Sequence, residues 1–258
     1  MPFKFCPNIS FLFNDIPFAQ RYQQAKVLGF QGVESGFPYN VDPKELVEAK
    51  VTSGLEHILL NIYTGDTSKG ELGCACIPDK SSTFDQALDK AIDLAKLLNC
   101  KKIHLMSGKI VGERTEKNDE AYLSNISRAV KKLEENSIIG LIEPINNITV
   151  PDYYMNNYDQ ALNVIKTIDS PNLKLMLDIF HLQQICGNIT YNIQKLLPYT
   201  GHVQIAQVPY RHEPNSAGEI DYKFVLRLLE SLNYHNWVGL EYNYKDGFGW
   251  ISEFGFKL

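Results

Sequence analysis

Residues 138–146 read IIGLIEPIN, a short apolar run that ends in a glutamate, Glu143, and then a proline. The segments on either side of it, 118–135 and 158–168, carry apolar residues at the three- and four-residue spacing of amphipathic helices. The run is therefore predicted to be a strand between two helices. A carboxylate at the end of such a strand needs a reason, because burying it unpaired would cost several kcal/mol or force it to take up a proton.

The same alternation of β-rich and amphipathic runs extends along the chain. Further helices are predicted at 17–28, 42–54, 83–98 and 224–232, and the segment 181–199 is predicted to break into two pieces at a glycine. The other strands are predicted in these runs: FKFCPNISFL, FQGVES, LEHILLNI, KKIHLMS, LKLMLDIF, GHVQIAQV and WVGLEYN. About eight strand–helix units of roughly thirty residues predict a single (β/α)₈ TIM barrel, one domain spanning residues 1–258. A doubly wound sheet is the alternative, and the sequence lacks the G-x-G-x-x-G turn typical of it.

Composition excludes several classes of protein. The chain has 258 residues, 44% of them hydrophobic, and a net charge of −5 with both signs interspersed. This pattern does not favour nucleic-acid binding. No apolar run is long enough to span a membrane and no export signal opens the sequence, so a soluble, cytoplasmic protein without a membrane partner is expected. The five cysteines are scattered and are predicted to be free thiols, including Cys74 and Cys76 of the CAC motif.

Four oxygen-bearing side chains follow apolar runs at consecutive strand ends: Glu143, Asp178, Gln204 and Glu241. In a TIM barrel the carboxyl ends of the strands share one face, where the chemistry takes place. Three carboxylates there would repel one another unless a cation lay between them. Any one of them could be a solvated loop group. Together they predict a divalent metal site, and hard oxygen ligands suit Mg²⁺ or Mn²⁺ better than zinc.

Two further residues are predicted to bind substrate. His181 lies three residues after Asp178, and Arg211 follows the seventh strand, where its guanidinium could grip a substrate carboxylate. A solvated turn histidine and a surface pair between Arg211 and Glu213 are the alternatives. His104 is placed mid-strand and is interpreted as a packed, hydrogen-bonded core histidine.

Several separate motifs resemble those of the hydroxypyruvate isomerases, within the xylose-isomerase-like barrel superfamily. They are IEPIN, LDIFH, HVQIAQVPYRHEP, GEIDY, GLEYN and the loop LLNIYTGDTSKGELGCACIP. The resemblance implies reversible conversion of hydroxypyruvate and tartronate semialdehyde (2-hydroxy-3-oxopropanoate), with Glu143 and Glu241 as proton donor and acceptor. Gln204 stands where the related ketose epimerases have a histidine, which fits the isomerase branch better. CACIP departs from that family's usual apolar residues.

The implied reaction needs a base that removes a proton next to a carbonyl, and an acid that returns a proton to the neighbouring carbon of the enediolate. Two carboxylates with separated pKa values suit this task. A metal-dependent ketose 3-epimerase and a catalytically inactive barrel that binds a metabolite or partner are the alternative functions. An endonuclease of the superfamily would need more histidine ligands and a basic groove. The need for the metal, a homo-oligomer and lid closure of loop 63–80 stay open.

Overall fold

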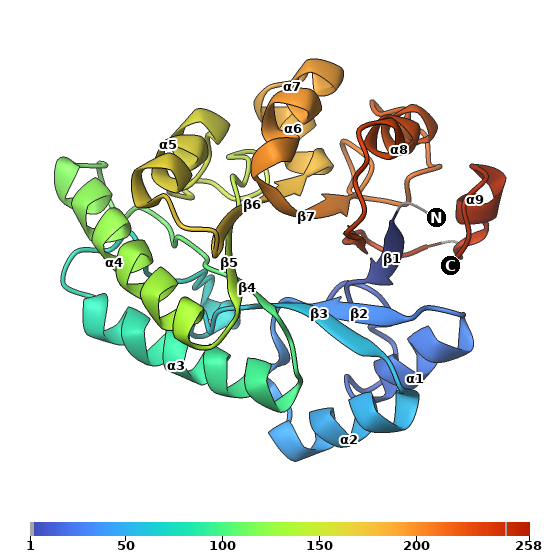
Figure 1. Cartoon of the computed structure of the whole chain (residues 1–258), viewed down its shortest axis with the longest axis horizontal. Coiled ribbons are helices and arrows are strands. Elements are labelled where there is room, and N and C mark those ends of the chain that lie inside the picture. Colours follow the sequence, from blue (N-terminus) through green and yellow to red (C-terminus); the bar gives the residue numbers. More distant parts are fainter. Residues whose placement is uncertain (1–2, 246) are drawn as a thin grey trace. The chain divides into compact units, whose positions relative to one another are not determined.

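The computed structural model describes residues 3–245 and 247–258 (Figure 1). The chain divides into two compact units, Met1–Ile58 with Leu177–Leu258, and Leu59–Met176. The eight strands found in the described residues alternate with helices in chain order, and each strand pairing given below is parallel. None of the helices in this part of the chain combines the length and apolarity required to cross a lipid bilayer.

The first unit contains the first two and the last two strands of the chain. β1 (Lys4–Pro7) pairs with β8 (Trp237–Leu240), which pairs with β7 (Thr200–Ile205). A parallel bridge from Asn8 to Glu34 brings the end of β1 beside β2 (Gly32–Ser35). Because parallel strands end at the same edge of their sheet, this pairing gathers the residues at and just after the strand ends.

The helices of the first unit lie largely where the sequence predicts them. α2 (Pro43–Ser53) begins at Asp42, whose side chain accepts a hydrogen bond from the Lys44 amide, and ends at Gly54 in the left-handed region. The segment 181–199 breaks as expected into α6 (Ile179–Ile185) and α7 (Ile189–Leu196), with Gly187 at a φ of 60° between them. The remaining helices are α1 (Gln20–Val27), α8 (Tyr222–Ser231), α9 (Gly249–Glu253), η1 (Pro38–Asn40) and η3 (Leu197–Tyr199).

The second unit carries the middle strands. β3 (Glu56–Asn61) enters it from the first unit, and β4 (Lys102–His104), β5 (Ile139–Ile142) and β6 (Leu173–Asp178) follow in parallel register. Apolar side chains of three of these strands, Leu59, Leu141 and Met176, form a buried cluster. The helices are η2 (Thr67–Lys69), α3 (Ser81–Leu97), α4 (Glu116–Glu135) and α5 (Tyr158–Ile168).

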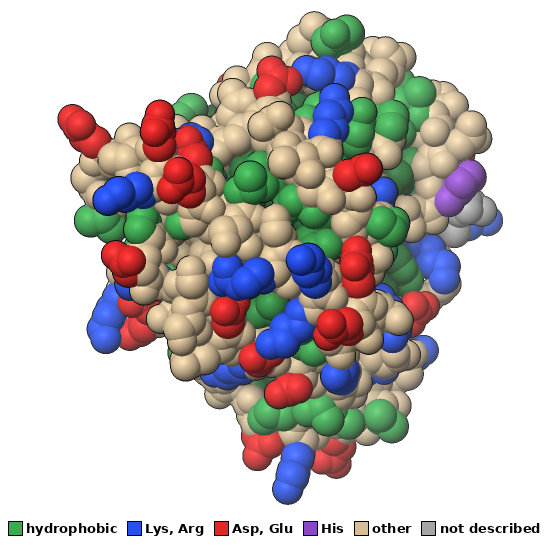
Figure 2. Space-filling model, turned by 60° about the vertical axis from the view of Figure 1, so that its left-hand side comes forward, with side chains coloured by type: hydrophobic (Ala, Val, Ile, Leu, Met, Phe, Trp, Pro, Cys, Tyr) green, Lys and Arg blue, Asp and Glu red, His purple; other side chains and the backbone are tan. Residues whose placement is uncertain are grey.

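One face of the surface carries charges of both signs. On the face in Figure 2, blue lysine and arginine side chains alternate with red aspartates and glutamates and do not form a stripe of one sign.

Candidate functional site

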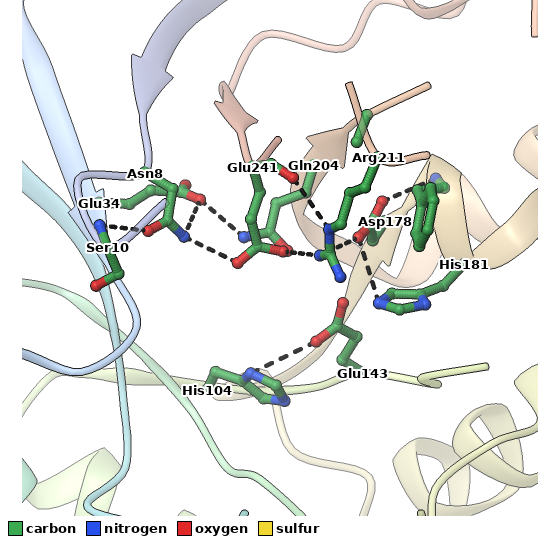
Figure 3. A network of polar contacts seen from close by, with 12 residues as sticks. Asn8, Ser10, Glu34, His104, Glu143, Asp178, His181, Gln204, Arg211 and Glu241 are labelled. Atoms are coloured by element: carbon green, nitrogen blue, oxygen red, sulfur yellow. Dashed lines mark hydrogen bonds and ion pairs between the residues drawn. The ribbon is translucent and has the colours of Figure 1, made fainter. Parts of the chain in front are cut away.

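Arg211 joins two buried carboxylates in the first unit (Figure 3). Its Nη2 lies 3.3 Å from Oδ2 of Asp178 and 2.5 Å from Oε2 of Glu241. Asp178 ends β6 and Glu241 directly follows β8, so both lie at the carboxyl ends of strands, as the sequence predicts. One guanidinium thus supplies the positive charge that two neighbouring carboxylates require in a buried site.

The guanidinium of Arg211 is held on several sides. Its Nε donates a hydrogen bond to the main-chain oxygen of Glu241, and the rings of Phe11 and Phe180 each lie with their centroids 4.9 Å from Cζ. The Arg211 backbone has a φ of 54°, in the left-handed region that few non-glycine residues adopt. These contacts fix the cation in place, and only 14% of its side chain is exposed.

Asp178 has two structural tasks. Its Oδ1 caps α6 by accepting a hydrogen bond of 2.8 Å from the Phe180 amide, and its Oδ2 faces Arg211. Nε2 of His181, in the first turn of α6, lies 3.5 Å from the same Oδ2. The histidine is buried, which excludes the alternative of a solvated turn residue.

Burial changes the proton affinity of both carboxyl groups. It raises the pKa of Glu241 to about 8, with Arg211 opposing the rise and the negative charges of Asp178 and Glu34 adding to it. Burial likewise raises the pKa of Asp178, against the influence of Arg211. A carboxyl group whose pKa lies near neutrality can both hold and release a proton, which is the requirement for general acid–base catalysis.

A second buried carboxylate, Glu34, organises the neighbouring side chains. It accepts hydrogen bonds from Nε2 of His202 at 2.6 Å, from Nε2 of Gln204 at 2.7 Å and from Nδ2 of Asn8 at 3.2 Å. Asn8 also donates to Glu241, at 2.9 Å. Burial acts to raise the pKa of Glu34, but His202 and the hydrogen bonds outweigh it and keep the pKa below its ordinary value. Glu34 is therefore ionised.

The donor set suits a hard divalent cation. Oε1 of Gln204 is buried and has no hydrogen-bond partner in the described part of the chain, so it is an acceptor to which a ligand could bind. Asp178 and Glu241 add carboxylate oxygens, and such oxygens are the usual ligands of Mg²⁺ and Mn²⁺. Cys6, Glu34 and His202 also lie close enough to share an ion, but these side chains are hydrogen-bonded to one another through Glu34.

In the second unit, Glu143 has a histidine neighbour. Oε2 of Glu143, which directly follows β5, lies 3.6 Å from Nδ1 of His104, and both side chains are buried. Burial lowers the pKa of His104 to about 3, so the ring is neutral. His104 is the last residue of β4, and neither ring nitrogen makes a hydrogen bond within the described residues. His104 is therefore a buried core residue as predicted, but the interpretation of it as mid-strand and hydrogen-bonded is wrong.

The loop after β3 lines a cleft of about 680 Å³ in the same unit, opposite residues of α3 and Lys109. Neither Glu143 nor His104 is among its lining residues. Cys74 is half-buried in the cleft wall, and burial raises its pKa and that of Cys76, the latter to about 12. All five cysteines are free, as predicted, and these two are not activated as nucleophiles.

Comparison with known proteins connects this arrangement to a family. A family model described as the xylose isomerase-like TIM barrel matches residues 22–254. The hydroxypyruvate isomerase of Escherichia coli is 37% identical over 93% of this chain and 93% of its own length. A relative from Danio rerio, named for the same activity, is 43% identical over 98% of this chain and 96% of its own. The chain belongs to the hydroxypyruvate isomerase family.

Structural comparison finds the same fold. A crystal structure described as an AP endonuclease, family 2, from Brucella melitensis is 35% identical and covers 97% of this chain and 98% of its own, with a TM-score of 0.93. A D-allulose 3-epimerase from Methylomonas sp. shares only the fold, at 17% identity, 93% and 84% coverage and a TM-score of 0.77. The prediction of an α/β TIM barrel of the xylose isomerase-like class is confirmed. The one-domain boundary of residues 1–258 stays a prediction.

Three residues of this isomerase were missed by the analysis of its sequence: Asn8, Glu34 and His202. Glu34 is the third of the four residues of β2, GVES, and the reasoning from strand ends that selects Glu143 also applies to it. His202 lies two residues before Gln204 on β7, so alternation along a strand places both on one face. Asn8 follows β1 directly. The signals for these residues were present in the sequence.

Proposed function

We propose that this isomerase interconverts hydroxypyruvate and 2-hydroxy-3-oxopropanoate. The observation that carries the proposal is its similarity to the hydroxypyruvate isomerase of E. coli over nearly the full length of both chains. The site chemistry supports it, because a carboxyl group with a pKa near neutrality lies beside a fixed guanidinium. The reaction needs these two functions: proton transfer at carbon and a hold on an anionic substrate.

In the proposed reaction, a glutamate removes a proton from C3 of hydroxypyruvate, which leaves an enediolate across C2 and C3. A proton then returns to C2 while the hydroxyl proton of the C3 oxygen passes to the C2 oxygen, so the C3 oxygen becomes the carbonyl and the product is the aldehyde. Glu143 and Glu241 are the proposed acceptor and donor. The pKa of about 8 for Glu241 supports this role, since a group that holds a proton at neutral pH can give it to carbon.

Arg211 and His181 are the proposed substrate-binding residues. A planar guanidinium can bind a carboxylate through two parallel hydrogen bonds, and hydroxypyruvate carries its carboxylate next to the reacting carbon. The two phenyl rings beside Arg211 support this role, because they limit the conformations from which the guanidinium meets the substrate. His181, buried beside Asp178, is proposed to hydrogen-bond a substrate oxygen.

We further propose a divalent metal, Mg²⁺ or Mn²⁺, with Glu143, Asp178, Gln204 and Glu241 as its ligands. The buried oxygen of Gln204 without a partner in the described chain supports this ligand set. When bound, such a cation would stabilise the negative charge of the enediolate. Arg211 pairs with both Asp178 and Glu241, and a divalent cation bound to the same carboxyl groups would release its guanidinium for the substrate.

A second substrate follows from another relative. A 2-oxo-tetronate isomerase of Pectobacterium atrosepticum is 36% identical over 96% of this chain and 97% of its own. That compound is also a 2-keto acid with a hydroxyl on the neighbouring carbon, so the same proton transfer would apply. We therefore propose small hydroxy-keto acids as the substrate class, with hydroxypyruvate first. The remote epimerases share the fold alone and give no support for a ketose substrate.

The proposal is tested by proton exchange in D₂O. The protein, metal-depleted or supplied with Mg²⁺ or Mn²⁺, is incubated with hydroxypyruvate, 2-oxo-tetronate or D-allulose and followed by NMR. Deuterium at carbon-bound positions of hydroxypyruvate, together with the aldehyde product, is the expected result. Exchange only with D-allulose would indicate an epimerase instead. No exchange with any of the three by a folded, metal-supplied protein would favour the inactive barrel.

A further inference from the structure

Glu34 has no role in the proposed reaction, yet four side chains converge on it. His202 and the Cys6 thiol meet its Oε2, at 2.6 Å and 3.5 Å, while Gln204 and Asn8 meet its Oε1. The residue is fully buried and comes from the end of β2 (Figure 3). A buried carboxylate with all its acceptor positions in use is a rigid attachment point for its neighbours.

The bond from Gln204 decides which end of that amide faces the site. A carboxylate without a proton only accepts hydrogen bonds, so Gln204 must turn its NH₂ group toward Glu34. Its carbonyl oxygen then points away from Glu34, and this is the buried oxygen that has no partner in the described residues. The charge of Glu34 thereby presents an acceptor, rather than a donor, to whatever binds beside Asp178 and Glu241.

Asn8 extends the same control to Glu241. Its Nδ2 donates one hydrogen to Glu34 and one to Oε1 of Glu241, while its Oδ1 accepts from the Ser10 amide. Both ends of the Asn8 amide are thus committed, and its orientation is determined. Glu241 is held on one oxygen by Asn8 and on the other by Arg211.

β8 leaves room for this network at Gly239. A Cβ atom added to that glycine would lie 2.4 Å from Oε2 and 2.5 Å from Oε1 of Glu34, closer than real contacts allow. Gly239 is two residues before Glu241, and its register partner on β1 is Cys6, which also contacts Glu34. The absence of a side chain at Gly239 therefore leaves the space that the Glu34 carboxylate occupies.

We propose that Glu34 is a positioning residue, which fixes the Gln204 carbonyl toward the site and holds Glu241 through Asn8. The inference rests on the proposed function in so far as Gln204 and Glu241 serve catalysis. It predicts that the charge of Glu34, and not only its volume, is required. Glu34→Gln keeps the volume but supplies its own NH₂ group, so Gln204 is free to turn over.

The experiment uses the full chain with ¹⁵N-glutamine labelling. The Gln204 side-chain amide is identified by its absence in Gln204→Met, and its exchange with water is measured in the natural protein. We expect the amide to exchange at least tenfold more slowly than those of exposed glutamines, since it donates to a buried charge. Exchange as fast as at an exposed glutamine would overturn the proposal without any variant and without any assay of turnover.

Glu34→Gln then tests the consequence. Loss of the slow Gln204 signal is expected, with a 10- to 100-fold weaker affinity for Mn²⁺, roughly the usual effect of removing a residue that orients a metal ligand. The double variant Glu34→Gln with Gln204→Glu exchanges amide and carboxylate and again turns an oxygen toward the site. It is expected to recover most of the Mn²⁺ affinity. An unchanged affinity in the single variant, or none recovered in the folded double variant, would contradict the inference.

Ser35→Ala is the matched control. Ser35 is the next residue of β2, is equally buried, and hydrogen-bonds His57 on the opposite face of the strand. Its loss should lower thermal stability while leaving Mn²⁺ affinity within twofold and the Gln204 signal in place. Equal losses of affinity in both variants would show a merely structural role for Glu34. Slow exchange of the Gln204 amide in a protein without isomerase activity would count against the proposed function alone.

Discussion

Replacement of Glu241 by glutamine should stabilise the folded protein at alkaline pH while abolishing its proposed chemistry. The reason is the buried carboxyl group, whose pKa rises from 4.5 to about 8 on folding. Between these values the folded chain holds a proton that the unfolded chain has released. Stability from this group is therefore complete below pH 4.5 and is lost as the pH rises through 8.

The size of the effect follows from the two pKa values. Compared with a group that stays protonated, titration of Glu241 lowers the stability of the fold by about 2 kcal/mol at pH 6 and about 5 kcal/mol at pH 9, taking about 1.4 kcal/mol for each tenfold change. Glutamine resembles the protonated carboxyl, keeps an oxygen acceptor for Arg211 and does not ionise. Glu241→Gln should therefore gain about 3 kcal/mol over the natural protein between pH 6 and pH 9.

Reversible urea unfolding of metal-depleted protein at pH 6, 7.5 and 9 measures this gain. Glu56→Gln, at an exposed glutamate of β3, is the control for the loss of one negative charge. A constant difference between Glu241→Gln and the natural protein across this range would refute the reasoning. It would mean that Arg211 keeps Glu241 ionised in the folded state at neutral pH.

The remaining predictions concern four other changes. Gly239→Ala should destabilise the fold by about 1–3 kcal/mol through its collision with Glu34, measured by thermal unfolding, whereas Gly249→Ala, with open space around it, should not. Arg211→Lys keeps the charge but loses the planar fork, so the KM for hydroxypyruvate should rise at least about tenfold, and an unchanged KM would remove Arg211 from substrate binding. Glu143→Gln should slow deuterium exchange by about 10²- to 10⁴-fold in a folded protein, and near-normal exchange would exclude it as the base. Chelation should abolish turnover and added Mn²⁺ or Mg²⁺ should restore it; full turnover after chelation would refute the metal proposal.

The repeating units could be predicted because each is local in sequence. α2 is a clear case, since Asp42 and Gly54 mark its two ends with side-chain and backbone chemistry that needs no tertiary contact. The break between α6 and α7 at Gly187 is another. Asp178, Gln204 and Glu241 could be selected as site residues for a related reason. Each apolar run marks a strand, and a polar residue at its end is predicted to lie on the face of the barrel where the chemistry takes place.

The rest depends on pairings between segments distant in sequence. Glu34 and His202 are 168 residues apart in sequence, and neither residue alone indicates that the other lies beside it. Arg211 lies in a loop with left-handed backbone, a conformation that its surroundings determine and residue type does not predict. His104 was misplaced because β4 ends three residues earlier than the apolar run suggests. The predicted roles of Glu143 and Glu241, and the metal, stay predictions.

Because Asp178 contacts both the Phe180 amide and Arg211, that amide can report on ligand binding. Its Oδ1 binds the amide of Phe180 while its Oδ2 binds Arg211, and the Phe180 ring rests on the same guanidinium. Any ligand that withdraws charge from Asp178 must weaken the first hydrogen bond of α6. The chemical shift of one backbone amide can thus follow binding in solution, with no label on the substrate and no change to the sequence.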